Sequence, residues 1–261
     1  MFTRPSSPKT IGGMLDDAFR LYGASWRVWI WPAVLSGLIQ AGLEAVELFE
    51  ARSGVTRPLF GYAFSSPTFA GLSLLAGLIG LWLYGTVLFA LDDTYNGREP
   101  SARHAFAEGG RIMPSVFGAS LVTGLGVAVA LIALIVPGLI LAGRWMLSPA
   151  AIVAERKDAM ASLRRSSDLV SGNWWRSVTT VSIALIIVLV LFFSAPFVAG
   201  VFYGLTSNLR GFQIAIVGLM GIERVITMAA WPAAMLVVFY DLRLRKEGSD
   251  LSARVEALGA A

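Results

Sequence analysis

The sequence contains no cysteine and a single histidine, His104. The first absence excludes disulfides, thiolate zinc sites and cysteine nucleophiles, and the second excludes a metal site built from several histidines. Phosphodiester hydrolysis needs a metal cluster or a fixed acid–base pair, and the sequence offers neither constellation. We therefore predict no catalytic residue, no metal site and no cofactor. His104 is expected on a solvated helix face.

Charge is also scarce, since 15% of the residues are charged and 56% are hydrophobic, with a mean hydropathy of +0.69. A soluble chain of 261 residues could not bury so much apolar surface in one core. Lipid is the solvent that accepts it, and the length suits one integral membrane domain over residues 1–261. The net charge of +4 reports topology in such a protein, so nucleic acid is not an expected partner.

Apolar stretches predict an all-α, polytopic transmembrane bundle of about six spans, because each supplies close to the roughly 20 residues that a bilayer crossing needs. Pro137-Gly138 divides one stretch that is too long for a single span, which predicts a hairpin turn there. Glu223 and Arg224 divide another, so residues 211–222 are either part of a long last helix or a re-entrant segment before it. The spans are expected near residues 28–48, 69–91, 115–136, 138–154, 178–202 and 217–240.

Three further segments repeat apolar residues at helical spacing and are too short and too charged to span. They predict amphipathic helices along the cytoplasmic face near residues 11–22, 102–113 and 158–170. Thr10 is a predicted N-cap of the first, and Ser101 and Asp158 open the other two.

The basic residues are distributed unevenly between the two sides of this bundle. The N-terminal segment, the loops after the second and fourth spans and the C-terminal tail hold most of them, whereas the opposite loops hold only Arg52, Arg57 and Arg210. Since basic residues gather on the cytoplasmic side of inner-membrane proteins, both termini are predicted to be cytoplasmic.

Several motifs in the second half resemble a bacterial family. They are Pro137-Gly-Leu-Ile-Leu-Ala-Gly-Arg144-Trp145, Gly172-Asn-Trp-Trp175 and Tyr240-Asp-Leu-Arg-Leu-Arg-Lys-Glu-Gly248. There, and at Ile11-Gly-Gly-Met-Leu-Asp-Asp-Ala-Phe-Arg-Leu-Tyr22 near its start, the chain is similar to the membrane domain of glycerophosphoryl diester phosphodiesterase membrane-domain proteins, so the resemblance covers most of the chain. The resemblance implies a bacterial inner-membrane protein without the soluble phosphodiesterase domain of some members. Because that membrane domain has no agreed activity, the resemblance transfers no catalytic residue.

Charges inside the spans are the candidate functional residues, because burying one in hydrocarbon costs about 3 kcal/mol unless it finds a partner or water. They form a candidate intramembrane polar cluster: Arg144, Glu44, Glu47, Glu223 and Arg224. The cluster is either a polar cavity open to the outside, suited to a lipid headgroup or solute, or a structural ion pair. In both cases Arg144 is expected to pair with Glu44, Glu47 or Glu223.

Other charges lie at the predicted span ends. Asp92, Asp93 and Asp241 are expected to cap helices or to pair with basic residues. The candidate contacts for anionic lipid, which could equally be simple topology anchors, are Arg243, Arg245 and Lys246.

Two functions are compatible with these features. The first is a non-enzymatic integral membrane protein that supports or regulates a partner in envelope or lipid-related processes. The second is a transporter or lipid-handling protein that uses the polar cluster. Membrane lipids and another membrane protein are the expected partners, and the sequence specifies neither the ligand nor the oligomeric state.

Overall fold

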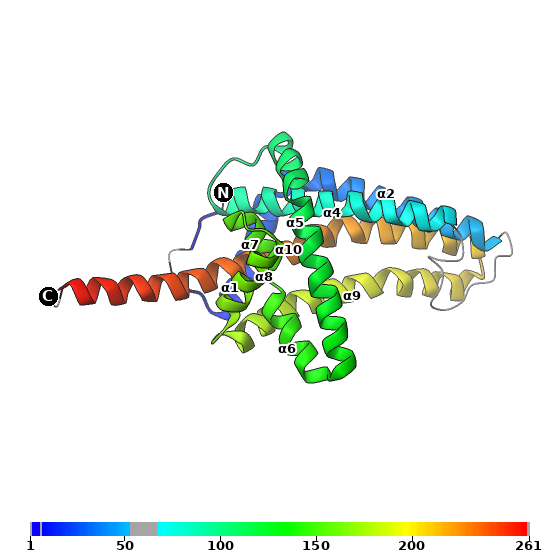
Figure 1. Ribbon diagram of the computed structural model, residues 1–261. Coiled ribbons are helices and arrows are strands. Elements are labelled where there is room, and N and C mark those ends of the chain that lie inside the picture. The colour runs from blue at the N-terminus through cyan, green and yellow to red at the C-terminus, as the bar shows by residue number, and fades with distance from the viewer. Residues whose placement is uncertain (1, 6, 53–66, 260–261) are drawn as a thin grey trace.

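The computed structural model describes residues 2–5, 7–52 and 67–259, which are helical apart from short connections (Figure 1). The all-α prediction is confirmed, because these residues contain no strand. Six helical segments within them, α6 and α7 taken together, are long and apolar enough to cross a membrane, so the protein is a multi-pass membrane protein. The helices of the described part are α1 (Ile11–Ala24), α2 (Trp26–Arg52), α4 (Pro67–Tyr95), α5 (Ala102–Ala133), α6 (Ile135–Trp145), α7 (Ser148–Glu155), α8 (Ala159–Val170), α9 (Trp174–Thr206) and α10 (Leu209–Gly259).

Four long helices, α2, α4, α9 and α10, run along a common axis, whereas α5 and α6 form a hairpin that runs across it (Figure 1). Helix α10 is central, since it contacts α1, α2, α4 and α9. Its residues from Met228 to Leu242 are nearly all buried, together with Phe89 and Tyr95 of α4. The densest core therefore lies at one end of the bundle, and the remaining apolar side chains face outward as lipid requires.

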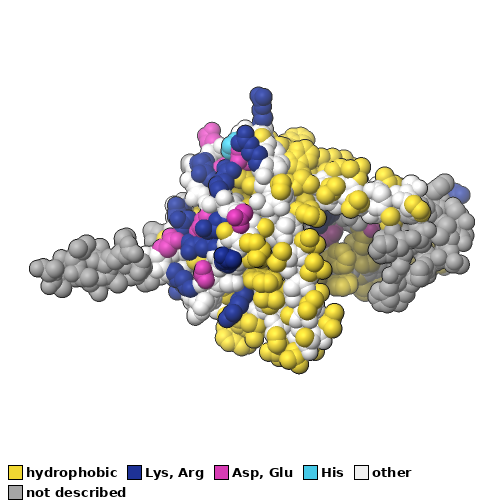
Figure 2. Space-filling view, in the orientation of Figure 1, with side chains coloured by type: hydrophobic (Ala, Val, Ile, Leu, Met, Phe, Trp, Pro, Cys, Tyr) yellow, Lys and Arg dark blue, Asp and Glu magenta, His cyan; other side chains and the backbone are white. Residues whose placement is uncertain are grey.

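Charged side chains gather at this densely packed end, around α1, α7 and α8, and a hydrophobic surface adjoins them (Figure 2). We call the densely packed, charged end the basic end. The opposite end, which carries the start of α10, is called the distal end. Such a separation is typical of a membrane protein, because charged groups stay in water while apolar ones face lipid.

Two of the three predicted amphipathic segments are helices, α1 and α8, and their position along the cytoplasmic face stays a prediction. The Thr10 side chain accepts a hydrogen bond from the backbone N–H of Gly13 at 3.2 Å, and Asp158 accepts one from Ala161 at 2.7 Å. Each side chain satisfies a free N–H at a helix start, which fixes where the helix begins.

The predicted break between residues 102–113 and 115–136 is wrong, because both segments belong to the continuous helix α5. Pro114 removes one backbone hydrogen bond without ending the helix. The first half of α5 is held in line by close contact with α4, where a Cβ at Gly109 would come within 2.5 Å of Thr86 Oγ1.

The hairpin turn also differs from its predicted position. It falls at Leu134, whose backbone is extended with φ −159° and ψ 135°. Pro137 lies in the first turn of α6, where a missing N–H costs no helical hydrogen bond.

The ambiguity of the last span is resolved in favour of one helix. Helix α10 is continuous from Leu209, so Glu223 and Arg224 lie within it and residues 211–222 are not a separate re-entrant segment.

Candidate functional site

A cavity of about 410 Å³ lies between α2, α4 and α10, within the membrane-spanning part of the bundle. Its lining includes one charged and several polar side chains: Ser36, Gln40, Ser73, Tyr84 and Arg224. Gly77 and Gly80 of α4 also line it, and a Cβ at either position would meet no atom within 4 Å. The glycine face of α4 therefore leaves room beside the polar groups.

Arg224 lies well inside the candidate span Leu209–Gly248. At 1.5 Å per residue it is about 22 Å from Leu209 and about 36 Å from Gly248. Its Nε donates to Ser36 Oγ at 3.1 Å, and among the described residues no carboxylate forms an ion pair with it. The other guanidinium N–H groups of Arg224 have no hydrogen-bond partner among the described residues, and such a planar set of donors suits a phosphate or carboxylate.

The predicted acids lie on α2 and α10, two of the helices that line this cavity. Glu44 is half-buried and accepts a hydrogen bond at 3.0 Å from Gln40, which lines the cavity. Glu47 is half-buried nearly one turn further along α2, and Glu223 precedes Arg224. Because α2 packs against α10, four of the five predicted cluster residues lie on adjoining helices.

Arg144 is separate from this group, and its predicted pairing with Glu44, Glu47 or Glu223 is wrong for the residues that the structure describes. Helix α6 packs on α5, α8 and α9. The Arg144 carbonyl accepts a hydrogen bond from Ser166 of α8 at 2.6 Å, which places this arginine at the basic end. The predicted pairing needs an α6 parallel to the bundle axis, and α6 runs across that axis (Figure 1).

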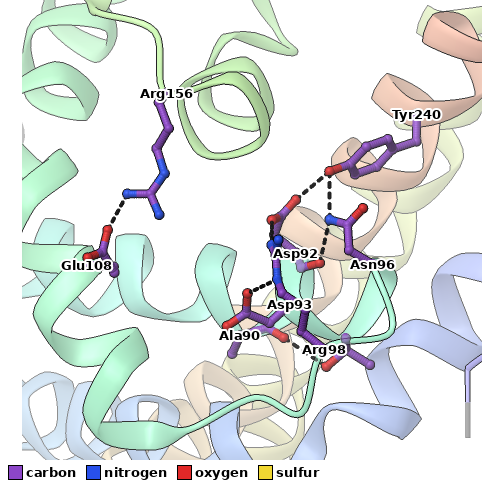
Figure 3. Close-up of polar contacts among 9 residues, drawn as sticks. Ala90, Asp92, Asp93, Asn96, Arg98, Glu108, Arg156 and Tyr240 are labelled. Atoms are coloured by element: carbon purple, nitrogen blue, oxygen red, sulfur yellow. Dashed lines mark hydrogen bonds and ion pairs between the residues drawn. The ribbon is translucent and has the colours of Figure 1, made fainter.

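A second polar cluster closes the basic end between α4 and α10 (Figure 3). Arg98 bridges the two acids that end α4, with Nη2 at 2.8 Å from Asp92 Oδ2 and Nε at 2.7 Å from Asp93 Oδ1. Tyr240 donates to Asp92 Oδ1 at 2.6 Å and accepts from Asn96 at 3.0 Å. The expected basic partner of Asp92 and Asp93 is thus confirmed. The polar groups of this network bond to one another, which indicates that the network holds α4 and α10 together.

Another ion pair stands beside it (Figure 3). Arg156, the left-handed residue that ends α7, pairs with Glu108 of α5, and Arg111 contacts the same carboxylate at 2.6 Å. The Glu108 side chain is only 5% exposed, so both arginines are needed to offset its burial. The Arg156 guanidinium also lies 4.5 Å from the centre of the Phe89 ring.

The basic residues predicted to contact anionic lipid form ion pairs or hydrogen bonds within the protein. Arg243 pairs with Glu247 and Arg245 with Asp241, each at 2.7 Å. Lys246 donates to the backbone carbonyl of Asp168. The two arginine pairs lie within α10 and Lys246 joins α10 to α8, which favours an internal role, and the lipid contact stays a prediction.

Apart from Arg224, the polar lining of the cavity was not identified from the sequence. Ser36 and Gln40 are four residues apart on α2, and Ser73, Gly77 and Tyr84 recur at helical spacing on α4. That spacing was the available signal, since small polar residues on one face of a span often meet another helix. Within the part of the chain that the structure describes, no three His, Asp or Glu side chains are grouped to hold a metal ion.

The model of an uncharacterised protein family, UPF0259, matches residues 68–215, more than half of the chain. No curated protein and no solved structure matches the chain. The resemblance to glycerophosphoryl diester phosphodiesterase membrane-domain proteins is therefore corrected. The resemblance depended on three features: a Pro-Gly hairpin followed by Arg and Trp, tryptophans at the start of a span, and a basic helix end. Many multi-pass proteins share these features because the boundary between lipid and water favours them.

Proposed function

Since the chain belongs to the uncharacterised protein family UPF0259, we propose from its geometry that it is a non-enzymatic lipid-handling membrane protein. In this proposal Arg224 binds the anionic headgroup of a lipid within the cavity between α2, α4 and α10. The observation that carries it is an arginine well inside its span, which donates to Ser36 and has no carboxylate partner among the described residues.

The position of Arg224 indicates what such binding is for. A resting phospholipid keeps its headgroup at the membrane surface, about 15 Å from the bilayer centre. A headgroup that reaches Arg224 has left that surface, so the cavity serves a lipid in passage between leaflets. Polar side chains on α2 and α4 replace part of the water that the headgroup loses, which lowers the cost of its entry.

The test is the movement of a fluorescent anionic phospholipid in vesicles that contain the purified protein. Dithionite bleaches the label in the outer leaflet, so the slow phase reports movement from the inner leaflet. We expect the protein to accelerate this phase severalfold over protein-free vesicles, and Arg224→Gln to abolish the acceleration. Arg210→Gln is the matched control, because it removes the same charge from the distal end of the same helix.

An unaccelerated slow phase with folded wild-type protein would contradict the proposal. The other function expected from the sequence, support or regulation of a partner in envelope or lipid-related processes, remains a prediction. It would be favoured by the same negative result together with a membrane protein that co-purifies in fixed proportion.

We also propose that the basic end faces the cytoplasm of a bacterial cell and that the protein resides in its inner membrane, with both termini on the cytoplasmic side. The gathering of charge around α1, α7 and α8 supports this orientation, because basic residues are retained on the cytoplasmic side during insertion.

A further inference from the structure

A second hollow lies at the foot of the crosswise hairpin, between α6, the end of α8 and the start of α9. It has a volume of about 480 Å³. Leu139 and Ile140 of α6 supply apolar walls, Trp174 and Trp175 of α9 stand opposite, and Arg144 is the charged side chain of the lining. It shares no residue with the cavity at Arg224.

Arg144 is fixed in place by its backbone while its side chain remains available. The Ser166 hydroxyl donates to the Arg144 carbonyl at 2.6 Å and accepts from the Leu147 N–H at 3.1 Å. The Arg144 side chain is exposed and has no hydrogen bond or ion pair with any described residue. The Arg144 guanidinium is therefore a positioned cation beside the apolar side chains of Leu139 and Ile140, which suits an anionic group with an apolar part.

The tryptophans define the level of the membrane surface. Trp174 donates to the Ile140 carbonyl at 3.4 Å and meets Trp175 edge-on, with ring centres 4.7 Å apart. Trp175 is 76% exposed. Indole rings prefer the boundary between headgroups and acyl chains, so the hollow that these rings line, with Arg144 and Leu139, is expected at that boundary.

We propose that this hollow binds an anionic glycerophospholipid. Its phosphate accepts hydrogen bonds from the Arg144 guanidinium and the Ser171 hydroxyl, and one acyl chain lies along Leu139 and Ile140. The charge of Arg144 complements the phosphate, and the apolar wall excludes a freely soluble anion as the preferred ligand. The bound lipid would then fill the hollow between the hairpin and the bundle.

The test is native mass spectrometry of the full chain released from nanodiscs that contain phosphatidylglycerol or phosphatidylcholine. Wild-type protein is expected to retain one phosphatidylglycerol that phosphatidylcholine does not replace. Arg144→Gln should weaken this retention about tenfold, as expected for one charge-assisted contact. Arg164→Gln is the matched control, since Arg164 is exposed on α8 and pairs with no described residue, and it should retain lipid as the wild type does.

Leu139→Trp fills the apolar part without changing charge and should also release the lipid, which separates a built site from general attraction to a basic surface. Retention by both Arg144→Gln and Leu139→Trp at the wild-type level would overturn the proposal. So would equal displacement of the lipid by glycerol 3-phosphate, which would indicate a site for a soluble phosphate. Arg224→Gln should leave retention at this site unchanged, so the outcome is independent of the proposed lipid movement.

Discussion

Gly37 of α2 and Gly221 of α10 are in backbone contact, because a Cβ built at Gly37 would come within 2.6 Å of the Gly221 carbonyl oxygen. This contact lies beside the Ser36–Arg224 hydrogen bond and allows the two helices to approach closely enough for it. Small residues are what permit such approaches between helices in lipid.

Gly37→Ala is therefore expected to push α2 away from α10. We expect a loss of about 1–3 kcal/mol, as for other overpacked contacts, and a loss of lipid movement because Ser36 shifts from Arg224. Thermal unfolding in detergent and the vesicle assay measure the two effects. Gly42→Ala, on the same helix with no atom within 4 Å of its Cβ, is the control. Equal stability of the two variants would show that the helices are not in contact at Gly37.

Arg156→Ala should destabilise the protein by leaving the buried Glu108 carboxylate with Arg111 alone. Arg156 is 56% exposed, so we expect about 1–2 kcal/mol, between the values for exposed and for fully buried pairs. Adding Glu108→Gln should restore part of this loss, because no charge is then stranded. Arg164→Ala on the α8 surface should change stability by less than about 0.5 kcal/mol. No recovery in the double variant would mean that the contact with Phe89 accounts for the loss.

Asp17 of α1 makes stability depend on pH. Burial raises the pKa of its carboxyl above the ordinary value of 3.8, more than nearby Lys9 lowers it, and its Oδ2 has no hydrogen-bond partner among the described residues. A raised pKa means that the folded state binds the proton more tightly, so ionisation costs stability above that pKa and nothing below the ordinary value. Asp17→Asn should therefore stabilise the protein at pH 7, and the gain should vanish as the pH falls toward 3.8.

Melting temperatures of Asp17→Asn and wild type, compared from pH 7 down to the lowest pH at which both stay folded, measure this gain. Asp16→Asn is the neighbouring control, because its side chain is 57% exposed and its pair with Arg20 lies at the surface. A gain for Asp17→Asn that does not change with pH would contradict the assignment to ionisation.

The crosswise course of α5 and α6 predicts that their turn lies within the hydrophobic layer (Figure 1). The natural chain has no cysteine, so single cysteines can be introduced without background. Val136→Cys should resist a membrane-impermeant maleimide added to either side of oriented vesicles. Thr206→Cys at the distal end and Met160→Cys on α8 should each react from one side, since both positions are exposed. Labelling of Val136→Cys from the distal side would mean that the hairpin crosses the membrane.

The sequence alone determined the features that depend on solvent and on local chemistry. Long apolar stretches require helices in lipid whatever their neighbours are, so the all-α class followed from composition. The Thr10 and Asp158 caps followed from side chains that bond within one turn. The partner of Asp92 and Asp93 was also local, because Arg98 follows them within six residues.

Only the tertiary structure decided which helices meet and at what angle. Hydropathy gives the same value for a span along the bundle and for a helix that crosses it, so the acid partner of Arg144 was predicted incorrectly. Residues 102–113 and 115–136 were expected to form separate helices, but they form one helix, α5, which packs closely on α4 where Gly109 meets Thr86. The pairing of Ser36 with Arg224 joins residues far apart in the chain through the close approach at Gly37. Such contacts depend on the shapes of two surfaces at once, and hydropathy records only one residue at a time.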